Sequence, residues 1–118
     1  MIHTREDEYG VNVLITDNSV PIPIGCANTS RIHDNEFYFN RLFVQPKFRN
    51  QGYACKILDT LLTIFKEKHY VLCLDINPYG DLDYEELERF YMKHGFKKYK
   101  VHNENIGNFY TYYFNKEE

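Results

Sequence analysis

Between residues 53 and 65, apolar side chains recur at intervals of three and four, the spacing that lines one face of an α-helix. These residues are Ala54, Ile57, Leu58, Leu61, Leu62 and Phe65. A β-rich aromatic run, Phe37 to Val44, precedes this helix, and a second apolar run, Tyr70 to Asn77, follows it. Strands joined through a helix pair in parallel, because the chain must cross back over the sheet. The sequence therefore predicts a βαβ unit in an α/β fold.

The rest of the chain carries signals for further strands and a second helix. The β-branched and aromatic content predicts strands at Val11–Thr16, Ile24–Ile32, Phe96–Val101 and Phe109–Phe114. Asp83 and Glu86 have the spacing of a capping box, which predicts a helix from about Tyr84 to Gly95. The first ten residues are polar, and we expect a tail or a short edge segment there.

Size and charge limit the classes of function. A chain of 118 residues is expected to form a single domain over residues 1–118. The net charge of -3 and the scattered basic residues argue against nucleic acid, and no apolar stretch approaches the roughly 18 residues that cross a membrane. Cys26, Cys55 and Cys73 are widely spaced, as expected for mostly buried, reduced thiols. These features predict a cytoplasmic protein.

A possible anion site lies between the run that ends at Val44 and the predicted helix. A helix N-terminus offers unpaired backbone N–H groups and a partial positive charge, and a glycine there lets a phosphate approach the backbone. Gly52 stands at that point, and Arg49 adds a full positive charge. A plain turn with a helix cap explains the same two residues, so the pattern alone leaves both interpretations open.

The segment Arg49-Asn50-Gln51-Gly52-Tyr53-Ala54 resembles the signature of the GNAT family of N-acetyltransferases: arginine or glutamine, two residues, glycine, one residue, then glycine or alanine. The segments Ile24–Ala27 and Phe90–Phe96 also resemble family motifs, in the right order. The resemblance implies a mixed, mainly antiparallel sheet with a central parallel pair that splays at the cofactor site, and two main helices. The chain is similar to compact, N-terminally shortened members, such as those that phages encode.

The resemblance also implies acetyl-CoA as cosubstrate and assigns residues to it. The backbone of Arg49, Asn50, Gln51, Gly52, Tyr53 and Ala54 would cradle the pyrophosphate. Phe43 and Val44 would offer a free strand edge to the pantetheine, and Asn77 would lie near its acetyl end.

For catalysis, the resemblance points to Tyr91 as the general acid. The alternative is that Tyr91 is only an aromatic residue that packs the helix against the sheet. The family often has an acid where Arg41 stands here, and arginine cannot act as a base. Asp75 could act as a base through water or serve as a structural hydrogen-bond partner.

The expected reaction is acetyl transfer to an amine, with a protein amine favoured over a small molecule. The acceptor groove is expected to be open, and the acidic insert of residues 78–83 could contact a basic acceptor. The alternative is a CoA-binding regulatory or interaction module without catalysis. The aromatic run from Phe109 to Phe114 has apolar residues on both faces and could pack in a homodimer, with packing in the core of the monomer as the default alternative.

Overall fold

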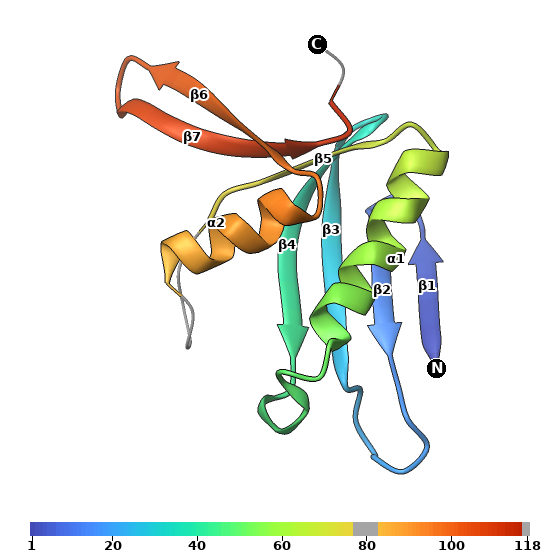
Figure 1. The fold of residues 1–118 in the computed structure, drawn as a ribbon. Helices are drawn as coiled ribbons and strands as arrows, with labels where there is room; N and C mark the ends of the chain where they lie inside the picture. The colour runs from blue at the N-terminus through green and yellow to red at the C-terminus, as the bar shows by residue number, and fades with distance from the viewer. Residues whose placement is uncertain (77–82, 117–118) are drawn as a thin grey trace.

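The structure, a computed structural model, describes residues 1–76 and 83–116. Its strands form one sheet in the order β1-β2-β3-β4-β5-β7-β6 (Figure 1). The elements are β1 (Ile2–Glu6), β2 (Val11–Ile15), β3 (Gly25–His33), β4 (Glu36–Val44), the short 3-10 helix η1 (Pro46–Phe48), α1 (Tyr53–Glu67), β5 (Val71–Leu74), α2 (Tyr84–Lys93), β6 (Lys97–Asn103) and β7 (Gly107–Phe114). Neither described α-helix is long and apolar enough to cross a lipid bilayer.

The strand pairing confirms the predicted mixed sheet. Strands β4 and β5 run parallel, and every other neighbouring pair in the described sheet is antiparallel. The N-terminal segment forms the edge strand β1, antiparallel to β2. Glu6 at the end of β1 accepts hydrogen bonds from Lys68 Nζ, at 2.5 Å, and from the Tyr70 hydroxyl, at 2.7 Å. These bonds fasten the sheet edge to the chain that follows α1.

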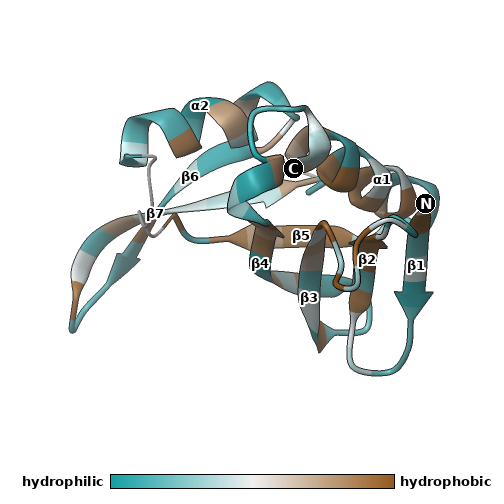
Figure 2. Cartoon of the chain, turned by 90° about the horizontal axis from the view of Figure 1, so that it is seen from below, coloured by the Kyte–Doolittle hydropathy of each residue, from teal (hydrophilic) through white to brown (hydrophobic). Residues whose placement is uncertain are grey.

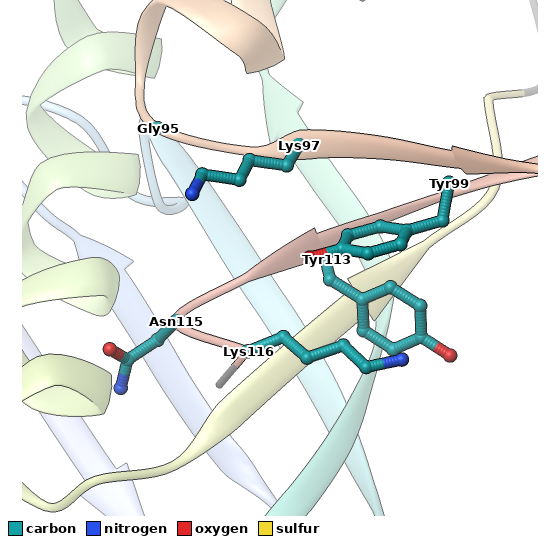
Figure 3. Close-up of a pocket in the computed structure, with 6 residues that line it drawn as sticks. All are labelled: Gly95, Lys97, Tyr99, Tyr113, Asn115 and Lys116. Atoms are coloured by element: carbon teal, nitrogen blue, oxygen red, sulfur yellow. The ribbon is translucent and has the colours of Figure 1, made fainter. Parts of the chain in front are cut away.

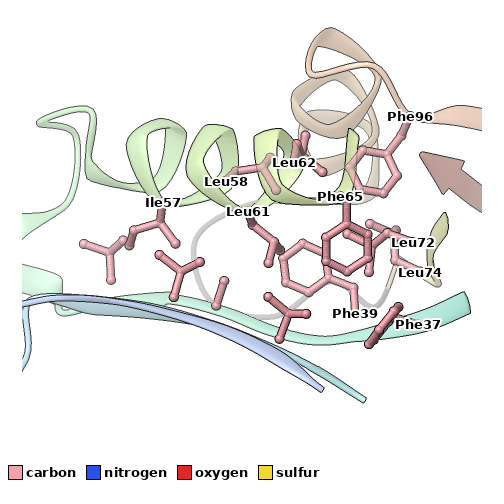
Figure 4. Close-up of a cluster of buried hydrophobic side chains, with 14 of the residues drawn as sticks. Phe37, Phe39, Ile57, Leu58, Leu61, Leu62, Phe65, Leu72, Leu74 and Phe96 are labelled. Atoms are coloured by element: carbon pink, nitrogen blue, oxygen red, sulfur yellow. The ribbon is translucent and has the colours of Figure 1, made fainter. Parts of the chain in front are cut away.

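Both helices cover the same face of the sheet (Figure 2). The helical spacing seen in the sequence places Ile57, Leu58, Leu61, Leu62 and Phe65 of α1 in the core, all buried (Figure 4). They pack with inward residues of the sheet such as Phe37 and Leu72. Full burial of each large apolar side chain stabilises the fold by about 1.5–3 kcal/mol, so this face of α1 anchors the molecule.

Helix α2 contacts the core through partly buried side chains such as Tyr84, Phe90 and Tyr91, and none of its residues is fully buried. At its start, Asp83 accepts a bond from the Glu86 backbone N–H at 2.9 Å, and the Glu86 carboxylate accepts one from Asp83 N, which confirms the predicted capping box. Beyond its end, Gly95 takes a positive φ of 103°, and the next side chain, Phe96, enters the core. The helix therefore begins and ends where the sequence predicts.

A buried tyrosine on β7 joins α2 to the sheet. The hydroxyl of Tyr112 lies 2.5 Å from that of Tyr84 and also bonds to the carboxylate of Glu88, both on α2. Glu88 in turn pairs with Lys98 of β6 at 3.0 Å. Burial, followed by these bonds, raises the pKa of Tyr112, so its hydroxyl stays protonated and donates to Glu88. This network holds α2 against the hairpin of β6 and β7.

Strand β5 is shorter than predicted. The apolar run suggested a strand from Tyr70 to Asn77, but β5 spans Val71–Leu74, and Asn77 lies outside the described residues, as do residues 78–82 of the predicted insert. The parallel register with β4 covers Glu36 to Tyr38 and stops at the pair Tyr38 and Cys73. Beyond that pair β4 continues to Val44 without β5 beside it, which confirms the expected splay.

A bulge changes the orientation of side chains along β4. The register with β3 shifts between the residue pairs Asn28–Arg41 and Thr29–Phe39, so Asn40 is an extra residue. Before the bulge Phe39 faces the core, and after it Leu42 and Val44 do so. Arg41 therefore lies on the opposite face from the helices, at the place where the strands separate.

Candidate active site

The separation of β4 and β5 opens a cavity of about 600 Å³. Its walls come from the second half of β4, the loop to α1, the first turn of α1, the end of β5 and one side of α2. Of the residues predicted from the sequence, it brings together Phe43, Val44, Arg49, Asn50, Gly52, Tyr53, Ala54, Asp75 and Tyr91. Gln51 does not line the cavity, and its side chain donates instead to the carbonyl of Lys47 at 3.3 Å.

The edge of β4 that faces this cavity has lost its strand partner. Antiparallel pairing with β3 continues to Val44 on the other edge, whereas the described pairing with β5 ends at Tyr38. An unpaired edge presents backbone N–H and C=O groups that an extended molecule can bond as an added strand. The Val44 carbonyl already accepts a bond from Arg49 Nε at 2.9 Å, which ties the loop to the end of the strand.

The N-terminus of α1 opens onto the same cavity. Gly52 is the N-cap residue with φ of 86°, and no side chain caps the helix. The first turn carries no acidic residue, so the helix dipole there is not neutralised by a neighbouring carboxylate. A Cβ added at Gly52 would meet no atom within 4 Å, and Gly52, Tyr53 and Ala54 line the cavity, so the start of the helix borders open space. The arrangement suits an anion such as a phosphate.

Tyr91 reaches the cavity from α2 within a cluster of aromatic rings. Its ring centroid lies 6.1 Å from that of Phe39, 5.3 Å from that of Phe90 and 5.5 Å from that of Phe96, all near edge-to-face. The side chain is half-buried and also lines the cavity. Tyr91 therefore packs against neighbouring aromatic rings and also borders the cavity.

Asp75 and Tyr38 meet at the point where the strands separate. The Tyr38 hydroxyl donates to Asp75 Oδ2 at 3.3 Å, and burial, followed by the charge of Asp75, raises the pKa of this tyrosine. Sequence reasoning missed Tyr38, although the alternation of Phe37, Tyr38 and Phe39 placed it on the outer face of β4. Arg41 also lines the cavity, with its guanidinium 4.6 Å from the centroid of the Phe43 ring.

A family model described as an acetyltransferase (GNAT) domain matches residues 9–98. The chain belongs to the GNAT family of acetyltransferases. This GNAT chain is an acetyl-CoA-dependent acetyltransferase. No curated protein matches the chain in sequence.

Solved structures of GNAT acetyltransferases share the fold. A GNAT acetyltransferase from Staphylococcus aureus Mu50 is 22% identical, with 91% of this chain and 68% of that chain covered and a TM-score of 0.65. The ribosomal-protein-S18-alanine N-acetyltransferase from Escherichia coli is 17% identical, with 92% of this chain and 70% of that chain covered and a TM-score of 0.69. The PaiA N-acetyltransferase from Thermoplasma acidophilum, solved in complex with coenzyme A, is 18% identical, with 90% of this chain and 60% of that chain covered and a TM-score of 0.65.

The described residues of this GNAT chain fit acetyl-CoA. The open N-terminus of α1 matches a diphosphate, and the unpaired edge of β4 matches an extended, amide-bearing chain. The cavity joins the two features. In the described residues, no three His, Cys, Asp or Glu side chains gather as metal ligands would.

Proposed function

We propose that this protein is an N-acetyltransferase that transfers the acetyl group of acetyl-CoA to a primary amine, with a protein amine as the favoured acceptor and Tyr91 as the general acid. The observation that carries the proposal is the shared cavity: Tyr91 lines the same space as the open N-terminus of α1 and the unpaired edge of β4. The whole chain, residues 1–118, would act as one acetyl-CoA-binding domain.

In this proposal the backbone around Gly52 binds the diphosphate of the cosubstrate. The first residues of α1 line that cavity at a helix start whose N–H groups no side chain caps, and Arg49 and Asn50 also line the wall. Phe43 and Val44 then pair their backbone with the pantetheine arm. Bound acetyl-CoA supplies an activated thioester, and the protein must orient it and manage protons.

Two proton movements are needed. A lysine with pKa near 10.4 is mostly protonated at pH 7, which costs about 4.6 kcal/mol to reverse, and an α-amino group of pKa near 8 costs less. Asp75 lines the cavity and accepts a hydrogen bond from Tyr38, and in this proposal it accepts the amine proton through water. A phenol with a pKa near 10 in water is protonated near pH 7, and in this proposal the Tyr91 hydroxyl protonates the departing sulfur.

The uncovered face of the sheet supports a protein acceptor. In the described chain, both helices pack on one face, and Tyr38 and Arg41 reach the cavity from the other. A polypeptide end can therefore approach from the uncovered face. Two structural neighbours point the same way: one acts on the alanine of ribosomal protein S18, and another is the NatC complex, which was solved with a Gag peptide and CoA (19% identical, TM-score 0.64).

The test separates binding from catalysis. Calorimetry measures acetyl-CoA affinity, and mass spectrometry measures the gain of one acetyl group on acceptor peptides. Tyr91→Phe is expected to keep affinity and to lower kcat by about 10²- to 10⁴-fold, the usual contribution of a general acid. The matched control is Tyr84→Phe, which removes a hydroxyl from the same helix at a residue that does not line the cavity.

Full turnover in Tyr91→Phe would show that the ring only packs. Binding of acetyl-CoA by the wild type without transfer to any amine would favour the non-catalytic CoA-binding module. The homodimer remains a prediction, for which Phe109 and Tyr110 offer exposed aromatic surface, with 38% and 48% of each residue accessible.

A further inference from the structure

Four side chains form a row across the uncovered face of the sheet. Tyr38 of β4 pairs with Cys73 of β5, Cys73 pairs with Tyr113 of β7, and Tyr113 pairs with Lys97 of β6. Residues directly opposite each other on neighbouring strands project from the same face. Since adjacent strands lie about 4.8 Å apart, Tyr113 is about 10 Å from Tyr38, which lines the cavity. The row therefore links the active-site cavity to the β6–β7 hairpin.

Tyr113, a member of this row, packs against Tyr99, and an ammonium group lies over the two rings. Their centroids are 5.3 Å apart at an angle of 87°. The Lys116 ammonium lies 4.0 Å from the Tyr113 centroid and 4.9 Å from the Tyr99 centroid (Figure 3). Both distances are within the range of attraction between a cation and an aromatic ring, about 6 Å.

The chain is fixed directly before Lys116. Asn115 donates from Nδ2 to the carbonyls of Phe65, at 3.3 Å, and Tyr70, at 2.9 Å. Lys116 itself is exposed, and its long side chain can leave the rings without disturbing this anchor. The ring pair can therefore exchange one ammonium group for another.

Carboxylates act on the ring pair from beyond the pocket lining, whose charged residues are Lys97 and Lys116. After burial, the negative charges of nearby groups raise the pKa of Tyr113, and Glu36 and Asp75 are among them. The same two carboxylates, after burial, contribute to raising the pKa of Cys73 to about 11, so that thiol is neutral near pH 7 and the carboxylates supply the field. Lys97 also lines this pocket, but in Figure 3 its ammonium extends away from the two rings, whereas the ammonium of Lys116 lies beside the Tyr113 ring.

We propose that the rings of Tyr99 and Tyr113, in the field of Glu36 and Asp75, form a subsite for a second cationic group of the acceptor, and that Lys116 fills this subsite in the free protein. The inference rests on the proposed function, since it takes the acceptor amine to enter the cavity beside Asp75. It adds the substrate class, a basic peptide.

The geometry also sets the spacing in that peptide. The row from Tyr38 to Tyr113 spans about 10 Å, and an extended chain covers about 3.3–3.6 Å per residue. A lysine about three residues from the acetylated amine therefore lies opposite the rings. Lys116 competes with it and lowers the apparent affinity of the acceptor.

The experiment compares two amidated pentapeptides with free N-termini, Ala-Ala-Ala-Lys-Ala and Ala-Ala-Ala-Gln-Ala, by NMR titration of the protein saturated with CoA. The measured quantity is the ratio of the two affinities, so general losses of binding cancel. We expect the wild type to prefer the lysine peptide and Tyr113→Leu to lower the ratio by about two- to fivefold, the usual contribution of one exposed cation–ring contact.

Two further variants make the result specific. Tyr113→Phe keeps the ring and removes only the hydroxyl, so its ratio should equal that of the wild type. Lys116→Gln removes the competing ammonium and should tighten binding of the lysine peptide by about two- to fivefold. An equal affinity for the two peptides in the wild type, or a ratio unchanged in Tyr113→Leu, would overturn the proposal.

The readout does not require catalysis, so it separates this proposal from the preceding one. Peptides that are acetylated without any preference for lysine would refute the cation subsite alone. A lysine preference that depends on Tyr113, with no acetylation of any peptide, would support the subsite and refute the transfer to protein amines.

Discussion

Gly52 and Gly107 provide a matched pair for testing the phosphate site. Their φ angles are 86° and 88°, and an added Cβ meets no atom within 4 Å at either position. Replacement of either glycine by glutamate therefore costs the same backbone strain, about 1–2 kcal/mol, without a steric clash. Gly52 caps α1 at the cavity, whereas Gly107 lies at the turn between β6 and β7, far from the start of α1 (Figure 1).

The two variants should differ only in binding. A carboxylate about 4 Å from a bound phosphate costs about 1 kcal/mol per unit charge in bulk water and about 4 kcal/mol at an effective dielectric constant of 20. Gly52→Glu should thus weaken acetyl-CoA binding between about fivefold and several hundredfold, while Gly107→Glu leaves it unchanged. Calorimetry measures the affinities, and urea unfolding verifies that the two variants lose similar stability. Equal affinity in both variants would refute the assignment of the phosphate to the start of α1.

Three further predictions concern the framework around the site, each measured by urea unfolding. Tyr112→Phe removes the hydroxyl that joins β7 to α2 and should lower the free energy of unfolding by about 1–2 kcal/mol; no change would mean that the network adds nothing. Phe65→Ala empties a fully buried position and should cost about 3–5 kcal/mol, a value that a marginal loss would contradict. The bonds from Lys68 and Tyr70 hold the pKa of Glu6 below its usual range, so its contribution to stability is present above about pH 4.3 and is lost as the pH falls through the lowered folded pKa. Glu6→Gln should therefore flatten the loss of stability on acidification, and an unchanged pH profile would count against this contact.

The features predicted correctly from the sequence depend on residues close together in the chain. The face of α1 follows from apolar spacing within 15 residues, and the start of α2 from the reciprocal bonds of Asp83 and Glu86. The loop from Arg49 to Ala54 combines a glycine, a basic residue and a helix start in one short segment. Its match to a family signature predicted the family and the cosubstrate, because the backbone that would hold a phosphate is local.

The features that only the tertiary structure decided depend on residues far apart in the chain. The strand after α1 pairs with β4 only as far as Tyr38 and Cys73, and its last residue, Leu74, pairs with β7. No pattern within Tyr70–Asn77 records these limits. The bulge at Asn40, which turns Arg41 away from the helices, arises from the register with β3.

The same reason explains the residues that sequence reasoning missed. Tyr38 meets Asp75 across 37 positions of the chain, and Lys116 lies on a ring pair from two different strands. Such contacts form only when the sheet brings distant segments into register, so local periodicity and composition do not predict them. The sequence by itself therefore determined the helices, the candidate phosphate loop and the family, while the packing of the sheet decided where the strands separate and which side chains meet at the candidate active-site cavity.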